Sequence, residues 1–262
     1  MKILMIGFGY NPRINDLIHD IKSSGLSLYY FDVFHPNQMT AFKNFNENVD
    51  GVILTGGGVK WGRDYKRFYK YRKINSVKKR NLQSIYDCNF NDNIDKSRCP
   101  EQNFIDFVNI PRKYHNIPIL GICYGCHILE LFYNGGLPTK LENKNTGRQI
   151  TKINKSPIFE NLYNKILYFD YNHYYYNKSP ALGSKIIAMQ NEMPAAFQYS
   201  PIHFGIQFHI IRSGEDGEQI LKNFLNICKK KSNTQEIIKI FTIFLIFTGS
   251  YYCISKRLSR KH

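Results

Sequence analysis

A cysteine lies between two glycines directly after an apolar stretch of the chain, in a Gly-x-Cys-x-Gly pattern over residues 121–125. Residues 118–122 have the composition of a buried strand, and apolar residues at helical spacing follow over 128–132. A sharp turn from a strand to a helix needs small residues two positions before and two positions after the reactive side chain. The spacing therefore predicts a nucleophile elbow that places the Cys123 thiol at the first turn of a helix, where the helix dipole favours the thiolate.

A histidine that could act as the base follows a second apolar stretch, residues 204–208. A thiol nucleophile needs a neighbouring base to accept its proton, and His209 has the right chemistry and a place at a strand end. The backbone N–H of Tyr124, directly after the cysteine, is placed to stabilise a developing oxyanion. A lone histidine at a strand end is more often structural, but the two motifs together indicate a Cys-His pair.

Three other interpretations of residues 123–127 compete with the elbow. The pattern C-x-x-C-H matches the attachment signature of a c-type haem, but that chemistry needs export and the sequence carries no export signal. Cys123 and Cys126 could form a thioredoxin-like redox pair, although such a pair does not call for the downstream histidine motif. A zinc site needs a second pair of ligands at matching spacing, which the sequence lacks. We therefore expect no metal and no cofactor, and we interpret Cys126 as a small apolar helix residue.

The elements that must position these residues alternate in a regular order. Glycines follow several predicted strands, and ligands of doubly wound α/β folds bind where the strands end. The predicted fold is α/β, with three layers: a mostly parallel open sheet, flavodoxin-like, with helices on both faces, plus a C-terminal hydrophobic helix. The predicted strands are 2–8, 27–33, 51–54, 118–122, 148–153, 166–171, 185–190, 195–199 and 204–208, and the predicted helices are 11–24 and 217–228.

The net charge of +16 is concentrated in two segments. Residues 60–80 contain ten lysines and arginines and one acid, and residues 229–262 contain eight and one. The rest of the chain is balanced, so a generally basic, nucleic-acid-binding surface is not expected. Residues 60–80 open a basic insertion at about 59–110, which is too long for an ordinary connection between a strand and a helix.

The last part of the chain changes character after residue 228. Residues 229–262 form a basic linker and a predicted transmembrane anchor at about 237–255, because 240–255 carry no charge and the segment has the length of a spanning helix. An amphipathic surface helix and a buried C-terminal helix are the alternatives. Six scattered cysteines and the lack of a signal peptide favour a reducing compartment. We expect a membrane-anchored protein whose catalytic domain faces the cytosol.

At these residues the sequence resembles the class I glutamine amidotransferases of the Cys-His-Glu type, and specifically the amidotransferase domain of GMP synthetase. The resemblance spans residues 1–228 apart from the insertion. The elbow and the strand that leads to His209 carry it most strongly. Further matches are Leu54-Thr55-Gly56-Gly57-Gly58, Gly135-Gly136, Gly147-Arg148, Ser156-Pro157-Ile158-Phe159, the Asn172-His173 pair where the family has Ser-His, and Ile220-Leu221-Lys222-Asn223-Phe224.

The resemblance implies that glutamine is hydrolysed to glutamate and ammonia through a thioester on Cys123, with His209 as the base. It implies an oxyanion site made by backbone N–H groups of Gly57 and Tyr124, beside Gly58. In the family the ammonia passes to a synthetase domain that aminates a nucleotide. No such domain follows residue 228, so we expect any synthetase to be a separate partner.

Two departures from the family pattern leave the activity open. Ile211 stands where the family has the triad glutamate, and Glu215 is the nearest acid in sequence. His127 stands where the family has a glutamine that contacts the substrate. Two hypotheses follow: a glutaminase with an incomplete triad, or a catalytically degenerate, membrane-tethered pseudo-amidotransferase that serves as a binding or regulatory module.

Overall fold

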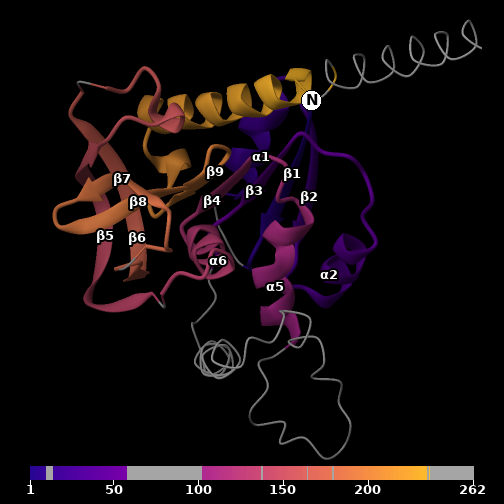
Figure 1. Ribbon diagram of the computed structural model, residues 1–262, viewed down its shortest axis with the longest axis horizontal. Coiled ribbons are helices and arrows are strands. Elements are labelled where there is room, and N and C mark those ends of the chain that lie inside the picture. The colour runs from indigo at the N-terminus through magenta and orange to yellow at the C-terminus, as the bar shows by residue number, and fades with distance from the viewer. Residues whose placement is uncertain are drawn as a thin grey trace, which may run out of the picture.

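The computed structural model of the protein describes residues 1–9, 14–57, 102–136, 138–163, 165–178, 180–234 and 236. Within these residues, one nine-stranded sheet runs through the molecule in the order β2-β1-β3-β4-β9-β8-β7-β5-β6 (Figure 1). Gly58, most of the predicted insertion and the predicted anchor at 237–255 lie outside the described residues.

The first half of the sheet is parallel. Its strands are β2 (Ser27–Asp32), β1 (Lys2–Gly7), β3 (Gly51–Leu54), β4 (Ile119–Ile122) and β9 (His203–Ile206). Strands β3, β4 and β9 are buried along their whole length, as their near-continuous apolar sequences predict for a sheet covered on both faces. Their carboxyl ends meet at one edge of the sheet, where the predicted site residues follow.

The second half is antiparallel, so the prediction of a mostly parallel sheet is wrong there and the sheet is mixed. Its strands are β8 (Met193–Ser200), β7 (Lys185–Gln190), β5 (Thr139–Ile153) and β6 (Leu167–Tyr176). The physical reason is the length of the connections. Two residues join β7 to β8 and two join β8 to β9, and only antiparallel neighbours can be joined so tightly.

Helices cover both faces of the parallel half, which confirms the α/β architecture. Helices α2 (Pro36–Lys43), α5 (Gln102–Lys113) and α6 (Tyr124–Phe132) pack on one face, where their apolar residues share a core with Leu4 and Leu54. Helix α1 (Ile14–Ser23) and a helix over 215–234 pack on the other face (Figure 1). The sequence did not predict α2 or α5, and residues 102–110 of the predicted insertion belong to α5.

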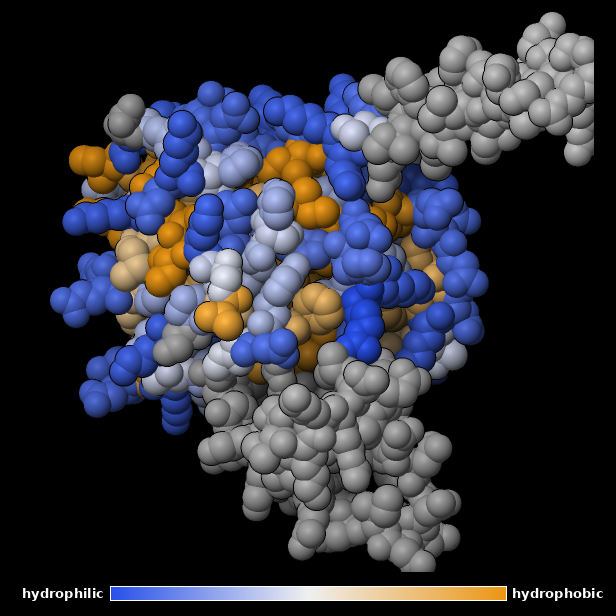
Figure 2. Space-filling model, in the orientation of Figure 1, coloured by the Kyte–Doolittle hydropathy of each residue, from blue (hydrophilic) through white to orange (hydrophobic). Residues whose placement is uncertain are grey.

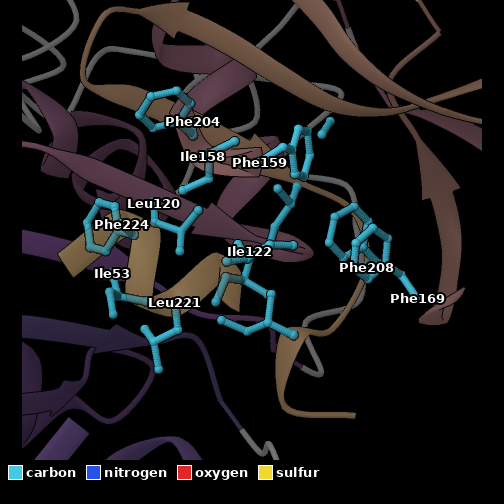
Figure 3. Close-up of a cluster of buried hydrophobic side chains, with 14 of the residues drawn as sticks. Ile53, Leu120, Ile122, Ile158, Phe159, Phe169, Phe204, Phe208, Leu221 and Phe224 are labelled. Carbon is cyan, nitrogen blue, oxygen red and sulfur yellow. The ribbon is translucent and has the colours of Figure 1, made fainter. Parts of the chain in front are cut away.

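The core on the side of the helix 215–234 extends to the antiparallel strands. Apolar side chains of β3, β4, β9 and this helix meet there, together with Ile158 and Phe159 of the short helix η2 (Pro157–Phe159) (Figure 3). This cluster therefore joins the two halves of the sheet beneath the strand ends. In Figure 2, patches of hydrophobic residues lie among hydrophilic side chains over the region of β5–β8.

None of the helices in the described ranges has the length and apolar composition that a membrane crossing requires. The predicted C-terminal hydrophobic helix is not found among them. The anchor at 237–255 stays a prediction from the sequence.

Candidate active site

Cys123 occupies the predicted elbow between β4 and α6. Its backbone has φ 52° and ψ −103°, an uncommon conformation for a residue with a side chain. Backbone hydrogen bonds hold it there: the Cys123 N–H donates to Ile206 O over 2.7 Å, and the Cys126 N–H donates to Cys123 O over 3.1 Å. The elbow is therefore fixed to β9 on one side and to its own helix on the other.

The two elbow glycines are required by close backbone contacts. A Cβ at Gly121 would lie 2.5 Å from Gly125 O, and a Cβ at Gly125 would lie 2.1 Å from Leu54 O. Both distances are far below a van der Waals contact. This confirms the steric reason from which the elbow was predicted.

Gly56 brings Cys123 and His209 to the same place. A Cβ at Gly56 would lie 3.4 Å from Cys123 Cβ and 3.2 Å from His209 Cε1. The predicted nucleophile and base, which are 86 positions apart in the sequence, thus flank a single glycine after β3. A side chain at position 56 would occupy the space between them.

Before substrate binds, Cys123 is a protonated thiol and His209 is a neutral imidazole. Burial raises the pKa of the Cys123 thiol to about 11, although a hydrogen bond from the Tyr124 backbone N–H opposes the shift. Burial lowers the pKa of His209 to about 4, with Asp170 raising and Arg212 lowering it further. The sequence predicted that the helix dipole would favour the thiolate; here burial outweighs it. The resting pair is therefore a thiol beside a neutral imidazole.

His209 is held by its backbone and has an unused ring nitrogen. Its N–H donates to Asp170 O over 2.8 Å, which forms a bridge between the end of β9 and β6. Its Nε2 atom is buried and has no hydrogen-bond partner among the described residues. The ring therefore has capacity for one more polar partner.

The predicted oxyanion site is tightly built where it is described. A Cβ at Gly57 would lie 2.0 Å from Phe8 O, so only glycine lets the loop after β3 pass the end of β1. The same loop is tied to the elbow by the Gly125 N–H, which donates to Thr55 O over 3.2 Å. Gly57 and Tyr124 thus belong to two connected segments.

Two further predicted residues lie in a buried polar cluster beside the pair. His127, on α6, is 2 % exposed, and its Nδ1 lies 2.7 Å from Asn177 Oδ1. His173, on β6, lies 3.3 Å from Asn145 Nδ2 through its Nε2. Burial lowers the pKa of His127 to about 3 and that of His173 to about 4, with His209 adding to the latter shift. All three histidines are therefore neutral near pH 7.

Neither position considered from the sequence, 211 or 215, supplies a carboxylate beside His209. Residue 211 is an isoleucine in the short helix η3 (Ile210–Arg212), and it packs partly against the apolar core. Glu215 is exposed at the start of the helix 215–234. Over the described ranges, no three histidine, cysteine or acidic side chains gather as a metal site would require.

Sequence reasoning missed Gly56 and Asp170 as members of the site. Gly56 lies in the glycine run 56–58, which marked the loop but not the residue that faces the pair. Asp170 carries no sequence signal, because its approach to His209 depends on the pairing of β6 with the end of β9.

Comparisons with known proteins find similarity to glutamine amidotransferases. Residues 100–228 match the family model "Glutamine amidotransferase class-I". Among curated proteins, "GMP synthase [glutamine-hydrolyzing]" of Treponema denticola is 24% identical over 246 residues, which are 88% of this chain and 36% of the relative. The enzyme of the same description from Lactobacillus gasseri is 36% identical over 124 residues, 45% of this chain and 23% of the relative. The chain thus spans about a third or less of these relatives' length.

Solved structures show the same fold. A protein from Thermoplasma acidophilum, described as a candidate GMP synthase subunit, superposes with a TM-score of 0.63 at 16% identity, covering 90% of this chain and 98% of its own. A glutamine amidotransferase from Thermotoga maritima gives a TM-score of 0.50 at 16% identity, with 88% and 85% covered.

Proposed function

This chain belongs, through residues 100–228, to the class-I glutamine amidotransferases, and we propose from that premise that it hydrolyses glutamine to glutamate and ammonia. The observation that carries the proposal is the position of Gly56, against which both the Cys123 and the His209 side chains lie. A nucleophile and a base that approach from two different strand ends to one point are what acyl transfer requires.

The reaction has four steps in this proposal. Cys123 Sγ attacks the side-chain amide carbon of glutamine while His209 takes the thiol proton. The carbonyl oxygen becomes an oxyanion, which backbone N–H groups of Gly57 and Tyr124 stabilise. The C–N bond then breaks, and His209 returns the proton to the leaving ammonia. Water hydrolyses the thioester, releases glutamate and restores the thiol.

The low resting pKa of His209 and the high pKa of Cys123 define what glutamine binding must achieve. The proton moves to His209 only where negative charge on sulfur and positive charge on the ring are stabilised together. A bound glutamine that excludes water and fills the oxyanion site strengthens every polar contact at the pair. The enzyme is therefore expected to be reactive toward glutamine and sluggish toward simple thiol reagents.

We further propose that the ammonia is used by a separate partner of the GMP synthase type. The matched part of this chain covers 36% of the GMP synthase of Treponema denticola and 23% of that of Lactobacillus gasseri. The similar protein from Thermoplasma acidophilum carries the description of one subunit of such an enzyme. A pull-down of the full chain against synthetase proteins of its own organism tests the pairing, with nucleotide amination from glutamine as the functional readout.

The test of glutamine hydrolysis is ammonia release by the full chain, alongside labelling by a glutamine-mimicking electrophile. We expect release and labelling at Cys123, and loss of both in Cys123→Ala. Cys126→Ala is the matched control, because its sulfur lies 3.8 Å from Tyr199 Oη in the core. Equal hydrolysis by Cys123→Ala would refute the proposal. If folded wild-type protein neither releases ammonia nor is labelled at Cys123, the alternative of a binding or regulatory module would be favoured instead.

A further inference from the structure

The proposed reaction leaves one task unassigned. When His209 takes the thiol proton it becomes a cation, and Cys-His and Ser-His enzymes commonly use a carboxylate to orient the ring and stabilise that cation. Ile211 cannot do this, and Glu215 is exposed. Assigning another residue to this task rests on the proposed glutamine hydrolysis, because only that reaction requires a cationic His209.

Asp170 is brought to His209 by the backbone. Residues 170 and 209 form an isolated antiparallel bridge, in which the His209 N–H donates to Asp170 O over 2.8 Å. The preceding residues reinforce the pairing: the Phe169 and Phe208 rings stack with centroids 4.0 Å apart and planes 6° apart (Figure 3). Stacking of these buried rings fixes the register that places the aspartate beside the histidine.

Ser213 ties the two residues together a second time. Its hydroxyl donates to His209 O over 2.8 Å and accepts from the Asp170 N–H over 3.1 Å. The serine is 1 % exposed, so these bonds are protected from water. The relative position of Asp170 and His209 is thus set by three hydrogen bonds and one ring stack.

The Asp170 carboxylate is partly sheltered from solvent. Its carboxylate is 13 % exposed and forms an ion pair with Arg212, 3.4 Å away from Oδ2. Three groups act on the His209 ring by charge: Asp170 and His173 from β6 and Arg212 from η3. Cys123 faces the same glycine, Gly56, as the ring does. Among the described residues, Asp170 is the acid whose charge favours a cationic His209.

We propose that Asp170 is the positioning residue that takes over from the carboxylate missing at position 211. In the reaction it stays ionised. The proton passes from Cys123 Sγ to a ring nitrogen of His209, and the negative charge of Asp170 stabilises the resulting imidazolium until the proton leaves with ammonia. The carboxylate acts on the ring by its charge from the neighbouring strand, not from two residues further along the same chain segment.

Four variants of the full chain test this assignment: Asp170→Asn, Asp170→Glu, Arg212→Gln and Glu215→Gln. We expect Asp170→Asn to lower kcat for glutamine by roughly 10²-fold while KM stays near the wild-type value, because Asp170 acts on His209 and not on substrate. Asp170→Glu should recover much of the loss. Glu215→Gln, which removes an exposed acid near the site, should match wild type.

Arg212→Gln separates positioning from a merely structural role. It breaks the same ion pair as Asp170→Asn but keeps the aspartate charge and removes an opposing cation. If Asp170 positions His209, Arg212→Gln should have a kcat equal to or above that of wild type. The acid limb of its profile of kcat against pH should move to higher pH, because a cation that lowers the pKa of His209 is gone. If Arg212→Gln instead mimics Asp170→Asn, or if Asp170→Asn is fully active, the proposal is wrong. Thermal unfolding midpoints confirm that each variant is folded.

A second readout distinguishes this proposal from the failure of glutamine hydrolysis itself. The rate at which a neutral alkylating amide labels Cys123 at pH 7 depends on proton transfer to His209, whether or not glutamine is turned over. Slower labelling in Asp170→Asn, with rescue by Asp170→Glu, supports positioning even if wild type releases no ammonia. Labelling at equal rates in all four variants would overturn it while leaving Cys123-dependent hydrolysis standing.

Discussion

Gly125 lies directly against the carbonyl oxygen of Leu54, so that a Cβ at position 125 would be 2.1 Å from that oxygen. The contact joins the first turn of α6 to the end of β3. Because the loop after β3 carries Gly56 and Gly57, the same contact sets the distance between the nucleophile elbow and the glycines that face it. Helix, loop and sheet therefore meet at one point that has no room for a side chain.

Gly125→Ala is accordingly expected to damage both stability and reactivity. The added methyl must displace backbone, and overpacking of this kind costs about 1–3 kcal/mol of unfolding free energy. Gly183→Ala is the matched control: its Cβ would meet nothing within 4 Å, although φ is +83°, so backbone strain of about 1–2 kcal/mol is its whole cost. Urea unfolding and electrophile labelling of both variants provide the measurement. Only Gly125→Ala should lose Cys123 labelling; normal labelling in that variant would contradict the tight elbow.

Acid should destabilise the fold over the pH range in which the histidines of the unfolded chain take up protons. Burial lowers the pKa of His127 to about 3 and the pKa values of His173, His203 and His209 to about 4. Between about pH 6.5 and 4 the unfolded chain therefore binds protons that the folded chain does not, and stability falls as pH falls, by about 1.4 kcal/mol per pH unit for each such proton. Burial raises the pKa of Glu130 to about 7, so folded Glu130 binds a proton in the same pH range. This proton offsets the contribution of one of the four histidines.

Urea unfolding at pH 7, 6 and 5 measures this effect. We expect the free energy of unfolding to decrease at each step, with a slope that steepens to about three protons between pH 6 and 5, because the histidines of the unfolded chain are only partly protonated above pH 6. A constant or rising free energy toward pH 5 would show that the histidines are protonated in the folded state. His173→Gln should reduce the slope by about one proton, since it removes one of the four groups.

The sequence predicted that Cys123 and His209 lie close together because the elbow and the strand ends impose steric constraints on the residue types. The elbow needs its glycines at fixed spacing, and Cys123 and His209 both follow apolar strands whose ends meet in a parallel sheet. The antiparallel pairing in the second half of the sheet was not predicted from the sequence. Strands β7 and β8 were expected at nearly their observed positions, but the antiparallel pairing of β8 with β7 and with β9 depends on two-residue turns that the expectation of a parallel sheet did not take into account.

Asp170 is a residue beside His209 that sequence spacing could not predict. Sequence spacing predicts the acid near His209 along the chain, at position 211 or 215. The acid beside the histidine comes from β6, whose register relative to the end of β9 is fixed by ring stacking and Ser213. No spacing rule links residues 170 and 209, since tertiary pairing alone brings them together.

His127 is expected to support the structure rather than to bind glutamine directly. It is 2 % exposed, and its Nδ1 lies 2.7 Å from Asn177 Oδ1. His127→Ala would leave a buried amide without this partner and open a cavity, which costs about 2–4 kcal/mol. Urea unfolding together with KM for glutamine measures both effects. A variant of unchanged stability and many-fold higher KM would instead place His127 at the substrate.

Ile211→Glu should restore activity only where Asp170 has been disabled. Position 211 is where the amidotransferase family has its triad glutamate, and Ile211 is half-buried against the apolar core. In the wild-type background the new carboxylate repeats what Asp170 supplies, so kcat should change little, while partial burial of a charge costs about 1–3 kcal/mol of stability. In Asp170→Asn protein the same change should raise kcat at least about 10-fold. Ile211→Gln in that background keeps the shape without the charge and should give no recovery; equal recovery by glutamine would mean that packing, not charge, limits His209.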